Sequence, residues 1–449
     1  MGEWVDTLRV LTAVPPPAAF ISYGTVNFLI GPANQWPAID VSLTNFLTSM
    51  FPSLWSSAPV LGTLYAAYTA AFYLRVSTAK ATNPIVTSKE EAPDRDALFE
   101  YRGLIHVHSD YSHDARGSYD ELSRDAHRHG LAFLVITDHN NVDAIAAGEQ
   151  GWRNGALLLT GVESKQREGY MLFVDIESYI HENSSSTRIA LQEYLREGGF
   201  GLVIHAGNCR RPWKGELDPA ITGLEILDYA DQLYDCSLLA KLNAFLFYPA
   251  NRALACLRVY HRPTETLARW DGAASTRPVV GFYGPNMHQN VRILGWEPRF
   301  PPADAVMPLA SNHILSREPL TGDFQSDRRI VYTAIRNGNL FFALDILGDS
   351  NGFRFSATQE SRSAIMGETL AADIETNFSV RLPRIESKSR FEIVVYRDGV
   401  EFLREKGREL TFRATQAGAY RVEVLAKVPT FFGGRMAPWI YSNPIYLRS

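Results

Sequence analysis

The chain has 449 residues and a formal net charge of −5, and its length allows two or three domains that each bury a core. This charge provides no field that would recruit nucleic acid, so no nucleic-acid partner is expected. Its three widely spaced cysteines, Cys209, Cys236 and Cys256, indicate neither a disulfide framework nor a cysteine zinc site.

Residues 1–85 form an apolar segment that differs from the rest of the chain. No charged residue occurs from 10 to 39, and after Asp40 none occurs from 41 to 74. Several prolines interrupt both stretches, which speaks against two long uninterrupted helices. The segment is therefore predicted to be helical in pieces and apolar throughout.

Two interpretations of this segment stay open. It contacts a membrane through residues 10–74, or it is an apolar extension packed on the rest of the protein or in a dimer interface. The most apolar piece, 60–74, is shorter than the roughly 20 residues of a spanning helix. If the segment inserts, Arg75 and Lys80 favour a cytoplasmic position for the domain after it, so the protein is expected to be cytoplasmic, with or without membrane association. Residues 86–98 are read as a solvated linker.

Histidines are concentrated in residues 101–141, which contain six of the protein's eleven. The stretch 103–108 alternates like a β-strand, and residues two apart on a strand point to the same face. His106 and His108 are therefore predicted to lie side by side at the end of this strand. Two adjacent imidazoles are typical of a metal site.

A helix and a second strand complete a βαβ unit. Ser118 and Glu121 have the spacing of a capping box, and the helix is predicted to end at Gly130. Residues 131–136 are continuously apolar, as in a strand buried on both faces of a parallel sheet. Such units place functional groups at the carboxyl ends of their strands, so His139 is expected beside the first two histidines.

Alternating strand and helix patterns continue to about residue 345. The predicted strands are 170–176, 201–205, 224–227 and 278–283, of which the last is expected to deliver Asn286 and His288 to the same edge. The predicted helices are 186–197 and the long apolar stretch 236–260, which Pro249 interrupts. This order predicts an α/β domain over residues 99–345.

The C-terminal part of the chain has the pattern of an all-β domain. Residues 391–402 alternate and turn at Asp398 and Gly399, a strong hairpin signal. Another amphipathic strand is predicted at 418–424. Short strands with turn signals predict a β-sandwich over 346–449, with a structural or substrate-shaping role.

These motifs resemble the PHP (polymerase and histidinol phosphatase) superfamily of metal-dependent hydrolases. The resemblance rests on HxHxxxSxD at 106–114, ITDH at 136–139, LTGVE at 159–163, GLVIHAG at 201–207, and GPNMH at 284–288 in place of the usual GSDAH. The ending at 438–447 looks like that of carbaryl-hydrolase-like members, which carry a C-terminal sandwich. The resemblance implies a distorted (βα)7 TIM-like barrel that holds metal ions at the C-terminal rim of its strands.

The resemblance also implies a set of metal ligands for one to three divalent ions, Zn, Mn or Fe. It places His106, His108 and Glu163 in a first site. Glu163 and His205 form a second site, and Asp114, His139 and His288 form a third. Asp138 is expected to be a hydrogen-bond partner of the ligands, a role that metal sites commonly need.

Two positions depart from the family's pattern. Asn286 stands where the family has aspartate, and Tyr170 stands where it has a histidine. An amide oxygen can coordinate a metal but brings no charge, and tyrosine is a reluctant ligand with an ordinary pKa of about 10. Tyr170 is instead expected to act as an acid or a substrate contact. Arg210 and Arg211 either bind an anionic substrate or belong to a solvated loop.

The sequence thus predicts a hydrolase in which a metal-activated water attacks a phosphoester, or a carboxylic or carbamic ester, of a small-molecule substrate. Two alternatives stay open. A degenerate PHP-fold protein would bind metal or ligand without turnover, as the two departures suggest. A membrane-associated scaffold or sensor would use the apolar segment and the sandwich.

Overall fold

The computed structural model describes residues 98–180, 187–248, 252–290, 298–383, 391–430 and 433–449. Nearly all of these belong to one compact unit, formed by residues 85–290, 299–429 and 434–449. The apolar segment 1–85 and most of the expected linker lie outside the described residues, so membrane contact stays a prediction. None of the helices within the described ranges is long and apolar enough to cross a membrane.

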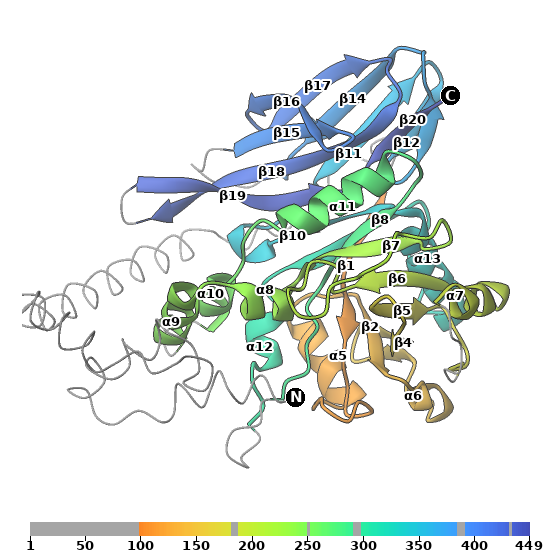
Figure 1. The fold of residues 1–449 in the computed structure, drawn as a ribbon, viewed down its shortest axis with the longest axis vertical. Helices are drawn as coiled ribbons and strands as arrows, with labels where there is room; N and C mark the ends of the chain where they lie inside the picture. The colour runs from red at the N-terminus through yellow and green to blue at the C-terminus, as the bar shows by residue number, and fades with distance from the viewer. Residues whose placement is uncertain (1–97, 181–186, 249–251, 291–297, 384–390, 431–432) are drawn as a thin grey trace, which may run out of the picture. The chain divides into compact units, whose positions relative to one another are not determined.

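The α/β part contains seven strands that lie side by side (Figure 1). In spatial order they are β1 (Phe99–Val107), β2 (Phe133–His139), β4 (Ala156–Lys165), β5 (Tyr170–Val174), β6 (Phe200–Ile204), β7 (Gly223–Asp228) and β8 (Val280–Gly284). All point the same way except β5, which is antiparallel to both neighbours. A parallel bridge between Val107 and Met287 brings the segment after β8 back to β1. The short β3 (Gly151–Arg153) pairs with β4 from outside this row.

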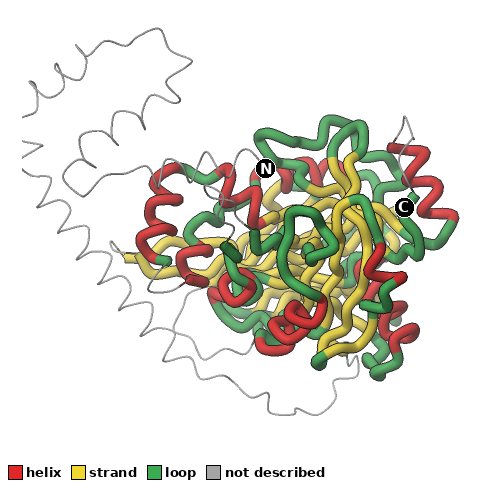
Figure 2. The backbone as a smooth tube through the Cα atoms, turned by 90° about the horizontal axis from the view of Figure 1, so that it is seen from below, coloured by secondary structure: helices red, strands yellow, loops and turns green. Residues whose placement is uncertain are grey.

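The helices follow the sequence pattern closely. The strands occupy the interior, and helices and loops surround them (Figure 2). Helix α5 (Tyr119–Arg128) begins at the predicted Ser118 capping box, and the chain turns at Gly130 with a φ of +67°. The other α-helices within the described residues are α6 (Asp143–Ala146), α7 (Thr187–Arg196), α8 (Tyr229–Asp235), α9 (Leu238–Phe247), α10 (Arg252–Leu257), α11 (Thr264–Ala274), α12 (Ala303–Val306) and α13 (Phe324–Asn337). The predicted helical stretch 236–260 is thus two helices, although Pro249 itself lies outside the described residues.

Successive residues of the parallel strands face two different apolar layers. Leu104 and Leu134 pack in a cluster with residues of α5, whereas Ile105 and Val135 pack in a second cluster with residues of α13. All four side chains are fully buried. The continuous apolar run at 131–136 therefore belongs to a strand buried on both faces, as predicted.

The prediction that β8 is the last strand of the α/β part is wrong. Two further strands, β9 (Ser311–Ser316) and β10 (Leu340–Ala343), extend the sheet, and β9 pairs antiparallel with β1. The sequence pattern did not predict β9, because this strand begins with the buried polar residues Ser311, Asn312 and His313 and has no continuous apolar run. Asn312 donates to the Tyr283 carbonyl at 2.7 Å and accepts from the Tyr283 amide at 2.8 Å.

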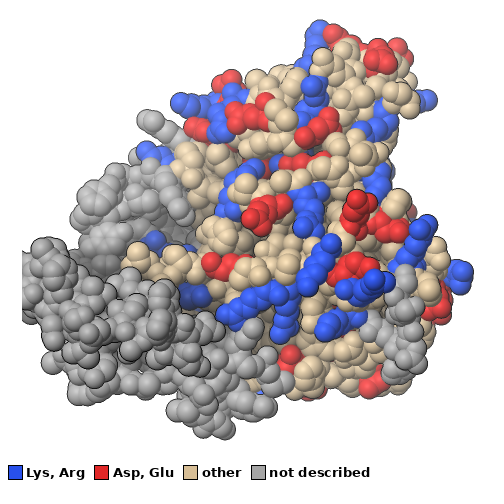
Figure 3. All heavy atoms as spheres, viewed as in Figure 1, with Lys and Arg blue, Asp and Glu red and all other residues tan. Residues whose placement is uncertain are grey.

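The C-terminal part is mostly β. Its strands are β11 (Arg354–Gln359), β12 (Arg362–Ile365), β13 (Thr369–Ala371), β14 (Thr376–Arg381), β15 (Phe391–Arg397), β16 (Val400–Lys406), β17 (Glu409–Ala414), β18 (Gly418–Thr430), β19 (Gly433–Ser442) and β20 (Ile445–Arg448). Asp398 and Gly399, with φ of 50° and 79°, form the predicted hairpin turn between β15 and β16. Basic and acidic side chains are mixed over this part on the face shown in Figure 3.

The C-terminal strands form two sheets, one of which continues the α/β sheet. Strands β12, β11, β14 and β17 form a separate four-stranded sheet. Strand β19 pairs with β10 of the α/β sheet, and β18, β20 and β13 follow it in spatial order. One sheet therefore includes strands from both sides of the predicted boundary at residue 345, and this boundary stays a prediction.

Two buried polar networks connect the α/β and C-terminal parts. Arg421 of β18 is 2% exposed and donates to both carboxylate oxygens of Asp271 in α11 and to Glu423. His313 of β9 is fully buried, with Nδ1 2.8 Å from Glu100 and Nε2 3.2 Å from Asp345. The same Nε2 atom lies 2.9 Å from Oγ of Ser350 in the C-terminal part. Both faces of β18 are thus buried between Gly418 and Val424, because the charged side chains of Arg421 and Glu423 have partners there.

Candidate metal centre

The predicted site residues meet at one edge of the seven-stranded row. Because six strands share a direction, their carboxyl ends lie at the same edge, and the antiparallel β5 begins there. The residues at this edge are His106 and His108 on or just after β1, His139 on β2, Glu163 on β4, Tyr170 on β5, His205 after β6, and Asn286 and His288 after β8.

His106 and His108 lie side by side, but simple strand alternation is not the cause. Their ring centroids are 5.2 Å apart. The pairing of β1 with β2 shifts register between Ile105 and Val107, and His106 has a φ of +73°. His106 is therefore the extra residue of a bulge, which re-aims its side chain toward that of His108.

Glu163 lies at the centre of the cluster. Its Oε2 atom is 3.0 Å from Nε2 of His106 and 3.1 Å from Nε2 of His108. The same oxygen is 3.6 Å from Nδ1 of His139, while Oε1 is 3.7 Å from Nε2 of His205. One carboxylate thus contacts four imidazoles, as expected of a group that bridges two metal positions.

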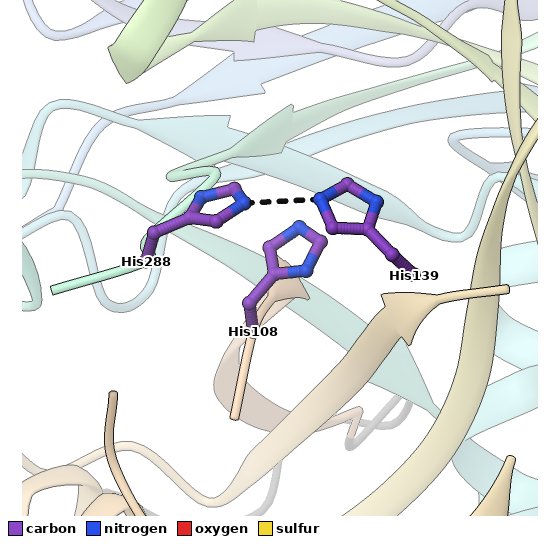
Figure 4. A group of neighbouring side chains, drawn as sticks. All are labelled: His108, His139 and His288. Atoms are coloured by element: carbon purple, nitrogen blue, oxygen red, sulfur yellow. Dashed lines mark hydrogen bonds between the residues drawn. The ribbon is translucent and has the colours of Figure 1, made fainter. Parts of the chain in front are cut away.

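Three histidines form a second group at one end of the cluster. His108, which follows β1, His139 at the end of β2, and His288, which follows β8, converge on one point (Figure 4). The Nε2 atoms of His139 and His288 are 3.2 Å apart, and Oδ1 of Asp114 lies 3.5 Å and 3.7 Å from them. The residues that the resemblance assigns to the third site are therefore together.

His108 is held in a defined orientation by a chain of hydrogen bonds. Ser112 Oγ donates to Asp138 at 2.8 Å and also lies 3.2 Å from Nδ1 of His108. Ser109 donates to the same carboxylate through its amide and its hydroxyl, at 2.7 Å and 2.6 Å. Since the Ser112 proton goes to Asp138, the hydroxyl accepts from Nδ1–H of His108, and Nε2 keeps a free lone pair. Asp138 thus contacts the serines and no imidazole, as expected for an outer partner.

Unsatisfied polar atoms in the cluster fit a bound cation. Nε2 of His108, Oδ1 of Asp114 and Oδ1 of Asn286 are buried and have no hydrogen-bond partner. Burying such atoms without a partner costs free energy, which a bound metal ion would offset. Imidazole and carboxylate donors together suit Zn²⁺, Mn²⁺ or Fe²⁺. These residues can therefore hold a divalent metal, although the donor set does not select one of the three.

Sequence reasoning missed three carboxylates on the other side of the cluster. Glu225 of β7 lies with Oε1 2.8 Å from Nδ1 of His106, and Asp228 and Asp231 lie beside His205. Glu225 reaches His106 because Gly284 has no side chain, since a Cβ there would lie 1.8 Å from the carboxylate. Two carboxylates on a buried strand, in the sequence LEILD, were the available signal.

Burial and neighbouring charges set the protonation of the cluster. Burial alone would lower the pKa of His106, but the charge of Glu225 and the hydrogen bond to Glu163 outweigh it and raise that pKa to about 10. Burial and the charge of His288 lower the pKa of His108 well below its usual value. Burial would raise the pKa of Glu163, but the charge of His139 and several hydrogen bonds hold it well below its usual range. His108 is therefore neutral and Glu163 ionised, the forms that bind metal, whereas His106 is protonated and would have to lose a proton to act as a ligand.

Tyr170 and the two arginines border the cluster. The Tyr170 ring makes an edge contact with the His205 ring, with centroids 5.8 Å apart. The guanidinium of Arg211 lies 5.9 Å from the centre of the Tyr170 ring, and that of Arg210 lies 3.5 Å from the Tyr234 ring. Both arginines are exposed. They lie on the His205 side of the cluster, where an anionic group of a substrate could reach them.

Comparison with known proteins finds a family model that matches the first part of this region. Residues 105–245 match the family model described as the PHP domain. The match confirms the resemblance at that level, includes every motif up to His205, and ends before Asn286 and His288. The carbaryl-hydrolase-like branch stays a prediction. No curated protein matches the chain.

One solved structure is similar to this chain at low sequence identity. It is a two-domain protein from Bacteroides vulgatus that contains a predicted PHP-like metal-dependent phosphoesterase. It is 13% identical to this chain, the alignment covers 78% of this chain and 98% of that one, and the TM-score is 0.38.

Proposed function

We propose that this protein is a metal-dependent hydrolase of ester bonds, with small-molecule phosphoesters as the first substrate class. The observation that carries the proposal is that the Glu163 carboxylate lies close to four imidazoles. One of them, His108, has a buried Nε2 atom without a hydrogen-bond partner. The match of residues 105–245 to the PHP domain supports the same chemistry. The strand order and the bridge from Val107 to Met287 support a TIM-like barrel as the scaffold.

The residues have separable tasks. His106, His108 and Glu163 would hold a first metal ion, and Asp114, His139 and His288 would hold another. A bound divalent ion supplies a Lewis acid that activates water and stabilises the negative charge formed at the attacked centre. Ser112 fixes the orientation of His108, and Glu225 accepts from His106 on the side away from Glu163.

Basic side chains favour a phosphoester over a neutral ester. Arg210 and Arg211 follow His205 in the same loop, and both are exposed to solvent. An arginine can bind two oxygens of a phosphate at once, which suits recognition of an anionic substrate. The Tyr170 ring lies near both His205 and Arg211, which supports a role for Tyr170 in contacting the same group.

Metal content and turnover test this proposal together. The full-length protein, purified without chelator, is analysed by plasma mass spectrometry beside His108→Ala, Glu163→Ala and the control His127→Ala, which alters an exposed residue of α5. Metal and hydrolysis of nitrophenyl phosphate diesters and monoesters should be lost in the first two variants and kept in the control. A wild-type protein that binds no Zn²⁺, Mn²⁺ or Fe²⁺ would overturn the proposal.

A second function, metal or ligand binding without turnover, is favoured by Asn286 and Tyr170. The Asn286 amide oxygen is buried and has no partner, but it brings no charge to the cluster. The variants Asn286→Asp and Tyr170→His distinguish the two functions. An enzyme adapted to its present residues should lose activity in both variants, whereas a protein without turnover should gain metal and activity.

A further inference from the structure

His205 has carboxylates on both sides of its ring. Its Nε2 atom faces Glu163 at 3.7 Å, the side that the family resemblance assigns to metal. Its Nδ1 atom lies closer to two other carboxylates, 3.3 Å from Oδ2 of Asp228 and 3.1 Å from Oδ2 of Asp231. These three ligand atoms all lie within 4.8 Å of one another.

The Asp228 carboxylate is aimed into this group by its place in the fold. Its Oδ1 atom caps α8 by accepting from the Asp231 amide at 2.9 Å. The cap leaves Oδ2 directed toward His205, and the residue is only 5% exposed. That oxygen is buried and accepts no hydrogen bond. An ionised oxygen in this position is costly unless a cation or a donor satisfies it.

The surroundings leave room for an ion and its remaining ligands. A cavity of about 260 Å³ is lined by His205, Asp228 and Asp231 together with Gly207 and Thr266, among others. Two carboxylates and one imidazole carry more negative than positive charge even when the imidazole is protonated. Oxygen and nitrogen donors of this kind suit Mn²⁺ or Zn²⁺, and the cavity can admit the waters that complete the coordination.

We propose that His205 Nδ1, Asp228 and Asp231 hold a divalent cation at a position outside the ligand set that the resemblance implies. The Glu163 side of His205 lacks one imidazole, because Tyr170 stands where the family has histidine. The opposite side offers two carboxylates in its place. The proposed position lies on the Nδ1 side of His205, opposite Glu163, and this inference goes beyond the proposed hydrolase.

The test measures metal stoichiometry in the full-length protein. Chelator-treated protein is equilibrated with Mn²⁺, desalted and analysed by plasma mass spectrometry. The variants are Asp228→Asn and Asp231→Asn, with Asp235→Asn as the matched control, since Asp235 lines the same cavity outside the group. Asparagine also caps helices well, so Asp228→Asn keeps the cap of α8.

We expect each of the first two variants to hold one equivalent of Mn²⁺ less than the wild type, and Asp235→Asn to hold as much. Equal stoichiometry in all four proteins would overturn the inference and make the two carboxylates orienting partners of His205 only. Should circular dichroism show that Asp228→Asn is unfolded, Asp231→Asn decides the result, because Asp231 is less buried.

A His108→Ala variant separates this inference from the proposed function. If it loses its own metal but keeps the equivalent that Asp231→Asn loses, the two positions are independent and both proposals stand. If the wild type binds Mn²⁺ that only His108→Ala removes, the position at His205 is refuted and the hydrolase remains supported. A wild type that binds no Mn²⁺ refutes the position at His205, and the Zn²⁺ and Fe²⁺ measurements then decide the hydrolase.

Discussion

Replacing Ser112 with alanine should weaken metal binding without removing any ligand. Ser112 Oγ connects Asp138 to Nδ1 of His108, at 2.8 Å and 3.2 Å. Without this hydroxyl, Nδ1 of His108 loses its acceptor, and the free lone pair on Nε2 is no longer enforced. Loss of such an orienting partner typically costs about 10- to 100-fold in metal affinity, or about 1.4 to 2.7 kcal/mol.

Ser109→Ala is the matched control for this prediction. Ser109 Oγ also donates to Asp138, at 2.6 Å, but it does not touch an imidazole. Each variant loses one hydrogen bond to the same buried carboxylate, so both should unfold more easily by about 1.5 to 3 kcal/mol. Only Ser112→Ala should lose affinity in a competition titration of Zn²⁺ against a fluorescent chelator. Equal affinities in the two variants would refute the orienting role of Ser112.

Two further predictions concern the buried networks. Burial lowers the pKa of His313, but the carboxylates hydrogen-bonded to it outweigh this and raise the pKa. The stabilisation from its charge is therefore complete below about pH 6.5 and is lost as pH rises through the higher pKa of the folded state. The melting temperature of His313→Gln should approach that of the wild type as pH rises above about 6.5, and a constant difference would contradict this. Arg421→Ala should destabilise the protein by about 3 to 5 kcal/mol in denaturant unfolding, because it leaves buried carboxylates unpaired. The exposed Arg404→Ala should cost at most about 1 kcal/mol, and equal losses would show that burial does not matter here.

The fold was predictable where local chemistry alone determines an element. A few adjacent residues are enough to predict the helix start at Ser118, the buried strand β2 and the turn at Asp398. Strand β9 could not be predicted, because its polar residues are buried by partners far away in sequence. Asn312 is satisfied by Tyr283, and His313 by Glu100.

The site was predictable only on the side that the family's motifs cover. Those motifs named His106, His108, His139 and Glu163, and the structure places them together. Glu225 was missed although it is 2.8 Å from His106, because 119 residues separate the two in the chain. Only the pairing of β7 with β8 brings that carboxylate across Gly284 to the histidine. No periodicity in the sequence encodes such a contact.

Three residues of the cluster have strained backbone conformations at or near the strand ends. His106, His205 and Asn286 have φ values of 73°, 56° and 46°, in the left-handed region that non-glycine residues seldom adopt. Such conformations cost of the order of 1 to 3 kcal/mol each and persist only where the surroundings enforce them. Glu225 enforces two of them, because it contacts the His106 ring and accepts from the His205 amide at 3.2 Å. An ordinary strand end would relieve this strain, so its presence at three positions of one cluster favours a site shaped for a ligand over a merely stable edge.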